Sequence, residues 1–88
     1  MEQHVWIVDD ELLIGLHLSK IFEENGYRAT SIKSGELCLA RLASGERPDL
    51  ILMDINLGDG RIDGPETTRR IYEQQDIPVV LHSAYTDR

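Results

Sequence analysis

The chain has 88 residues, of which 41% are hydrophobic, so it has enough apolar side chains to form one small domain with its own core. Its formal net charge of −7 opposes binding to nucleic-acid phosphates and to anionic membrane surfaces. The single cysteine, Cys38, cannot form a disulfide within the chain, and no apolar run is long enough to cross a membrane, so we expect a cytoplasmic domain.

The N-terminal part of the chain predicts a strand followed by a helix. The apolar run Val5–Val8 is typical of a strand that is covered on both faces. A helix is expected over residues 11–24, because apolar side chains recur there at helical spacing, and the Asn-Gly pair at 25–26 would end it. The residues of its expected apolar stripe are Ile14, Leu18 and Ile21.

The middle of the chain repeats this alternation. Residues 27–32 mix apolar and polar side chains, which predicts an edge strand. Ser34 is a favourable N-cap for a second helix, which would end near Ser44 and the glycine that follows it. The apolar residues of this helix are Leu37, Cys38 and Leu42. Leu50–Met53 is then a second buried strand.

A third helix is expected from Asp63 to about Gln74. Asp63 provides an acidic N-cap, Pro65 lies in the first turn, and Glu66 occupies the capping-box position. The last predicted strand covers residues 77–81. Strands that alternate with helices at this spacing predict an α/β fold with a doubly wound parallel sheet and helices on both faces.

Three acidic residues follow the buried strands. Asp9 and Asp10 come directly after Val8, and Asp54 comes directly after Met53. If the two strands lie side by side, their carboxyl ends coincide at the edge where open α/β sheets bind ligands. Three carboxylates crowded there would repel one another unless a cation balances them, and hard divalent cations take oxygen ligands. The pattern therefore predicts a metal site, and it favours the first and third strands as neighbours.

These residues give the chain a resemblance to the receiver domain of two-component response regulators. The matching motifs, in chain order, are Val8–Glu11, Leu52–Ile55, Asp63–Gly64, Pro78–Val80 and Ser83–Ala84. The resemblance covers the whole chain, with the motifs in register. It implies the flavodoxin-like receiver fold, in which the strand order begins 2-1-3-4.

The resemblance also implies roles for individual residues. Asp54 would be the phosphoacceptor, attacking a phosphohistidine on a histidine kinase or phosphotransfer protein. Asp10, Asp54 and the backbone carbonyl of Asn56 would bind Mg²⁺ directly, with Asp9 acting mainly through water. Ser83 would be the switch hydroxyl that senses the phosphoryl group. On this reading the protein is a signalling phosphoacceptor rather than an enzyme with a separate substrate.

Two departures from the family pattern qualify the resemblance. The loop between Asp54 and Asp63 is slightly longer than the commonest form, and Gly58 replaces a proline often found there. The sequence also ends at Arg88, before the fourth helix, the fifth strand with its lysine, and the last helix. We therefore expect a partial receiver domain over residues 1–88. It should be marginally stable or pair as a homodimer, and it should accept phosphoryl groups poorly.

Three other functions match parts of the pattern. An aspartate-nucleophile phosphatase of the haloacid dehalogenase type needs a second acid two residues after Asp54, where Asn56 stands. A calcium-binding loop that starts at Asp54 needs a glutamate where Pro65 stands. A pseudo-receiver would normally lack part of the acid cluster, which is complete here, although the fragment itself could behave as one.

Individual features also allow plainer interpretations. Asp9 and Asp10 could simply cap the first helix, and a serine at position 83 could belong to a turn. The leucines at positions 12, 13 and 16 lie off the apolar stripe of the first helix and near the acids. They could form a docking surface for a kinase, or they could be covered by a later helix.

Overall fold

The computed structural model describes residues 2–58 and 61–83. Four strands form one sheet in the order β2-β1-β3-β4, and each neighbouring pair is parallel. The strands are β1 (His4–Val8), β2 (Arg28–Ile32), β3 (Leu50–Asp54) and β4 (Val79–His82). The predicted α/β fold and the 2-1-3-4 order are therefore confirmed, with the two most apolar strands at the centre of the sheet.

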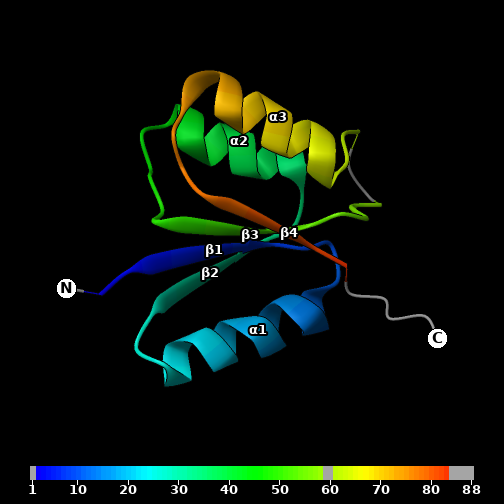
Figure 1. Ribbon diagram of the computed structural model, residues 1–88. Helices are drawn as coiled ribbons and strands as arrows, with labels where there is room; N and C mark the ends of the chain where they lie inside the picture. Colours follow the sequence, from blue (N-terminus) through cyan, green and yellow to red (C-terminus); the bar gives the residue numbers. More distant parts are fainter. Residues whose placement is uncertain (1, 59–60, 84–88) are drawn as a thin grey trace.

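Helices cover both faces of this sheet (Figure 1). The helices are α1 (Leu12–Glu24), α2 (Gly35–Ala43) and α3 (Gly64–Gln74). In Figure 1, α2 and α3 lie side by side on one face, and α1 lies alone on the other. We call the face under α2 and α3 the closed face, and the face under α1 the open face.

The predicted caps define the starts of α2 and α3. Ser34 Oγ accepts the N–H of Leu37 at 3.1 Å, and Asp63 Oδ1 accepts the N–H of Glu66 at 2.9 Å. Each bond satisfies a backbone donor that the first turn of a helix leaves free. The Glu66 carboxylate pairs with Arg69 and Arg70 of its own helix, so the second half of the predicted capping box is replaced by ion pairs along α3.

The closed face holds the main hydrophobic core. Ten buried residues from the sheet and from the α2 and α3 side pack into one cluster, namely Trp6, Val8, Ile32, Cys38, Leu42, Ile51, Met53, Leu57, Ile71 and Ile77. Trp6 lies in β1 and is only 1% exposed. Burial raises the pKa of the Cys38 thiol to about 12.

The open face is packed less completely. Gly15 is the buried residue of α1, and a Cβ added there would meet Ser31 of β2, so the helix backbone approaches the sheet at this point. Ile14 and Leu18 are half-buried, but Ile21 is 41% exposed, so its predicted place on the stripe facing the core is wrong. At 3.6 residues per turn, Ile21 points roughly 120° away from Gly15 around the helix.

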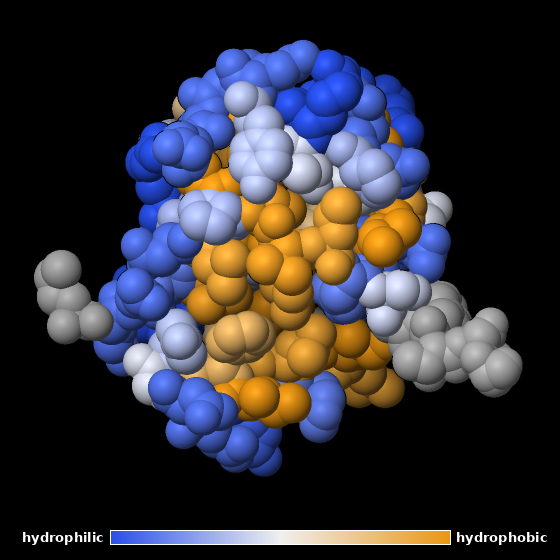
Figure 2. All heavy atoms as spheres, viewed as in Figure 1, coloured by the Kyte–Doolittle hydropathy of each residue, from blue (hydrophilic) through white to orange (hydrophobic). Residues whose placement is uncertain are grey.

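Strand β4 is the outer strand on one side of the sheet in the described part of the chain. It begins at Val79 rather than at residue 77, because Pro78 has no N–H for the ladder, although its carbonyl accepts the N–H of Ile51 at 3.0 Å. Val80 and Leu81 are exposed. Figure 2 shows hydrophobic side chains gathered across the middle of the face that carries this strand.

Candidate functional site

The three acids meet at the carboxyl edge of the sheet. Asp9 follows β1 directly, Asp54 is the last residue of β3, and these strands are neighbours because Val8 pairs with Met53. One carboxylate oxygen from each of Asp9, Asp10 and Asp54 lies within 4.8 Å of the others. The predicted juxtaposition of these acids is present, and the set of ligand atoms fits a hard divalent cation.

Asp9 has the most buried carboxylate of the three, with an exposed fraction of 1%. Its Oδ1 accepts the N–H of Glu11 at 2.8 Å, whereas its Oδ2 is buried and has no hydrogen-bond partner among residues 2–58 and 61–83. Burial raises the pKa of Asp9, and the negative charges of Asp54 and Asp10 raise it further. A buried carboxylate oxygen without a donor is costly, and a cation at this point would compensate it.

Asp54 is held firmly by its backbone surroundings. It is 3% exposed, and its Oδ1 accepts the N–H of Asn56 at 3.0 Å. A Cβ on Gly64 would clash with the Asp54 carbonyl oxygen, so the first residue of α3 packs directly against the end of β3. The next residue, Ile55, donates its N–H to the carbonyl of His82 at 2.8 Å. This bond continues the pairing of β3 with β4 beyond Asp54.

The loop after β3 brings further polar groups to the cluster. The N–H of Gly58 donates to Asp10 Oδ2 at 2.9 Å, so a backbone amide lies on one of the three carboxylates. The side-chain amide of Asn56 donates to Ser83 Oγ at 3.4 Å. The structure therefore brings the predicted switch serine beside the loop that leaves Asp54. The last residue of the Ser83–Ala84 motif lies outside the described residues.

The sequence did not predict the contacts by which three residues hold this loop. Gly58 acts through its backbone amide, and Gly64 is required by the close approach to Asp54. Glu36, in the first turn of α2, accepts the N–H groups of Arg61 and Ile62. No local pattern predicts such bonds, because their partners are backbone groups distant in the sequence.

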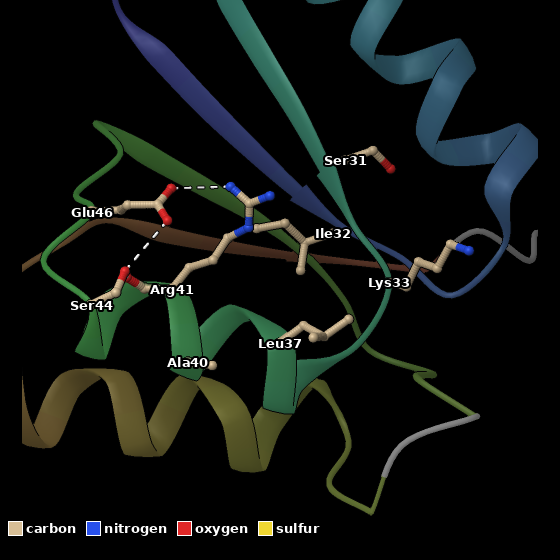
Figure 3. A pocket seen from close by; sticks show the side chains of 8 residues that line it. All are labelled: Ser31, Ile32, Lys33, Leu37, Ala40, Arg41, Ser44 and Glu46. Carbon is tan, nitrogen blue, oxygen red and sulfur yellow. Dashed lines mark hydrogen bonds and ion pairs between the residues drawn. The ribbon is translucent and has the colours of Figure 1, made fainter.

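A cavity of about 310 Å³ lies elsewhere, between the end of β2 and α2 (Figure 3). Its lining includes Ile32, Lys33 and Leu37 but none of the three acids. Arg41 at this cavity already pairs with Glu46 at 3.0 Å, so its charge is largely balanced. The acid cluster therefore remains the candidate site.

Within residues 2–58 and 61–83, no helix is both long enough and apolar enough to cross a membrane.

Known proteins share this fold and this sequence pattern. NtrX, a nitrogen assimilation regulatory protein of Azorhizobium caulinodans, is 37% identical over 86 residues, which are 97% of this chain and 19% of NtrX. Sporulation initiation phosphotransferase F of Bacillus subtilis is 31% identical over 86 residues, which are 97% of this chain and 67% of that protein. The chain thus spans only part of the length of these relatives.

Solved structures agree with these relatives. The N-terminal domain of a response regulator/sensory box/GGDEF 3-domain protein from Carboxydothermus hydrogenoformans matches with a TM-score of 0.90 and 34% identity. The match covers 98% of this chain and 68% of that structure. The acidic pocket of this chain lies at the carboxyl edge of the sheet, which is where open α/β folds bind ligands.

The sequence profile of the response regulator receiver domain matches residues 5–88. The chain belongs to this family, as its motifs predicted. Receiver domains of two-component systems are phosphorylated on an aspartate, bind Mg²⁺ at their acidic pocket, and interact with histidine kinases or phosphotransfer proteins.

Proposed function

We propose that this chain is a partial receiver domain, over residues 1–88, in which Asp54 accepts a phosphoryl group from a histidine kinase or a phosphotransfer protein. One observation carries the proposal: the buried Asp54 carboxylate lies at the end of β3 with an oxygen within 4.8 Å of ligand atoms of both Asp9 and Asp10. Phosphoryl transfer needs positioning and charge neutralisation, and this arrangement supplies both once a cation is bound.

The acid cluster would hold Mg²⁺. Asp10, Asp54 and the backbone carbonyl of Asn56 would be direct ligands, and Asp9 would act mainly through a bound water. The unpartnered Oδ2 of Asp9 and the raised pKa of that residue support the need for a positive charge here. A divalent cation held by these residues would supply charge neutralisation for the transferring phosphoryl group.

The transfer itself would use the carboxylate of Asp54 as the nucleophile. Oδ1 of Asp54 accepts the N–H of Asn56, a bond that orients the carboxylate, and one of its two oxygens would attack the phosphorus atom. A new O–P bond forms as the P–N bond of the phosphohistidine, whose other ring nitrogen carries a proton, breaks, and the electron pair of that bond returns to the imidazole nitrogen. The product is an acyl phosphate on Asp54 and a neutral histidine on the donor.

Ser83 would report the modification. Its hydroxyl lies within 3.4 Å of the Asn56 side-chain amide, beside the loop that leaves Asp54. A phosphoryl group on Asp54 would offer strong acceptor oxygens to this hydroxyl, so the conformation in which Ser83 donates to them would gain population. The domain acts as a cytoplasmic signalling switch, and any catalysis is limited to its own phosphorylation and dephosphorylation.

The experiment compares the wild type with Asp54→Asn, Asp10→Asn and a control, Asp76→Asn, which changes an exposed acid away from the cluster. Isothermal titration with Mg²⁺ measures binding, and peptide mapping after incubation with a phosphorylated kinase locates any phosphoryl group. We expect Mg²⁺ binding to weaken at least tenfold in Asp10→Asn and the label to map to Asp54, with the control unchanged. A phosphoryl group that persists in Asp54→Asn, or Mg²⁺ affinity that is equal in all variants, would contradict the proposal.

A further inference from the structure

Glu36 makes an unusual connection for a residue in the first turn of a helix. Its Oε2 accepts the backbone N–H of Arg61 at 2.7 Å and that of Ile62 at 3.0 Å. Both donors belong to the loop between β3 and α3, 25 and 26 positions further along the chain. Glu36 Oε1 is also buried. The carboxylate therefore connects α2 to the loop that follows Asp54.

The same loop touches the acid cluster. Near its start, the N–H of Gly58 donates to Asp10 Oδ2 at 2.9 Å. At its end, the N–H of Gly64 lies 3.4 Å from the carbonyl of Ile55, and Gly64 packs against the Asp54 carbonyl. In the described parts of the loop, Gly58 is thus held by Asp10, residues 61–62 are held by Glu36, and Gly64 is held against the end of β3.

Packing around Glu36 makes this anchor rigid. A Cβ on the neighbouring Gly35 would clash with Thr67 of α3 and lie 3.1 Å from the side chain of Ile62. The first turn of α2 therefore contacts both the loop and α3 without space for relaxation. Nearby N–H groups, its own and those of Arg61 and Ile62, lower the pKa of Glu36, so the carboxylate is ionised at neutral pH.

We propose that Glu36 is a positioning residue for the metal site: it anchors the loop so that the Gly58 amide orients the carboxylate of Asp10. This inference rests on the proposed function of the acid cluster. Partners one step removed from a metal ligand fix its orientation, and their loss weakens metal binding without removing a ligand. The charge-assisted bonds from Glu36 to two amides are stronger than neutral ones, which suits an anchor.

The test uses Glu36→Ala and Glu36→Gln, with Glu66→Gln as the control. Glu66 is also an acid in the first turn of a helix, and its carboxylate pairs with Arg69 and Arg70 of the same helix. We expect Glu36→Ala to weaken Mg²⁺ binding by about threefold to tenfold, because Glu36 acts through the Gly58 amide, whereas losing a direct partner of a metal ligand costs about 10–100-fold. Glu36→Gln should lie between Glu36→Ala and the wild type, because its amide oxygen still accepts N–H donors, and the control should match the wild type.

Two further readouts separate positioning from general destabilisation. The amide resonance of Gly58 should shift in Glu36→Ala before metal is added, and the phosphorylation rate at saturating Mg²⁺ should stay close to that of the wild type. Equal Mg²⁺ affinity and an unmoved Gly58 resonance in both Glu36 variants would overturn the inference, even if Asp54 is phosphorylated. Absence of Mg²⁺ binding in the wild type would instead overturn the proposed function, and the Gly58 resonance would then test the anchor by itself.

Discussion

The two faces of the sheet are covered by helices to different degrees. On the closed face, α2 and α3 cover a contiguous core and pack against each other, with Gly35 in direct contact with Thr67. On the open face, α1 contributes Gly15 as its buried residue, and Leu12, Leu13 and Leu16 are exposed. The closed face also supplies the anchor at Glu36 and the start of α3 behind Asp54. The more completely packed half of the domain is therefore the half that positions Asp54, the proposed phosphoacceptor.

The largest difference between the faces should appear in core truncations. Ile51→Ala removes a fully buried side chain from the closed face and should lower the free energy of unfolding by about 2–5 kcal/mol. Leu13 on the open face is 79% exposed, so Leu13→Ala should change the free energy of unfolding by less than about 0.5 kcal/mol. Urea denaturation followed by circular dichroism measures both. Equal losses would mean that the open face is buried in solution.

Two glycines extend the comparison to helix packing. Gly35→Ala places a Cβ against Thr67 and Ile62, which have no room to move, and should cost about 1–3 kcal/mol. Gly15→Ala meets the hydroxyl of Ser31. In a Ser31→Ala background that contact is relieved, and Gly15→Ala should then stabilise α1 by about 0.5–1 kcal/mol. The same denaturation experiment applies. If Gly15→Ala lowers the free energy of unfolding in the Ser31→Ala background, the helix backbone itself lies too close to the sheet for a Cβ.

A smaller effect on stability is expected at Asp9, which lies at the carboxyl edge of the sheet. Its pKa is raised in the folded state, so its contribution to stability falls as the pH rises from the unfolded pKa through the folded pKa. Asp9→Asn lacks this penalty and should unfold at a higher temperature than the wild type at neutral pH without metal. The advantage should vanish in acid, where the wild-type carboxyl is protonated in both states.

Adding Mg²⁺ gives the internal control for this prediction. The cation binds the folded wild type and should raise its melting temperature, and it should raise that of Asp9→Asn less. A variant that melts below the wild type in the absence of metal would contradict the charge crowding inferred for Asp9.

The smallest effect on stability, but a change in association, is expected for the exposed leucines. Leu16 and Leu37 are both 52% exposed, and they lie on α1 and α2, respectively. If the open face pairs two copies of the chain, Leu16→Gln should reduce association in sedimentation experiments, whereas Leu37→Gln should leave it unchanged. A wild type that stays monomeric at every concentration would exclude this homodimer.

The sequence predicted those features that depend on residues close together along the chain. The apolar runs of β1 and β3 identified central strands, and Ser34 and Asp63 identified the starts of two helices. The acids Asp9, Asp10 and Asp54 could be brought together because parallel strands place their carboxyl ends at one edge.

Features that depend on contacts between distant segments could not be predicted. The exposure of Ile21 depends on how α1 lies against the sheet, which it approaches most closely at Gly15, and helical periodicity alone does not show this. The role of Glu36 depends on backbone amides of the loop, and every residue type except proline offers the same amide. A carboxylate in the first turn of a helix is common, so its residue type alone carries no signal.

The single tryptophan gives this domain an internal optical reporter. Trp6 is 1% exposed in the middle of β1, within the core of the closed face, and its indole Nε1 has no hydrogen-bond partner in the part of the chain described. Its emission should therefore be that of an indole in an apolar, water-free environment, and it should move to longer wavelength when the closed face opens. Fluorescence would therefore report on the packing of the closed face without any added label.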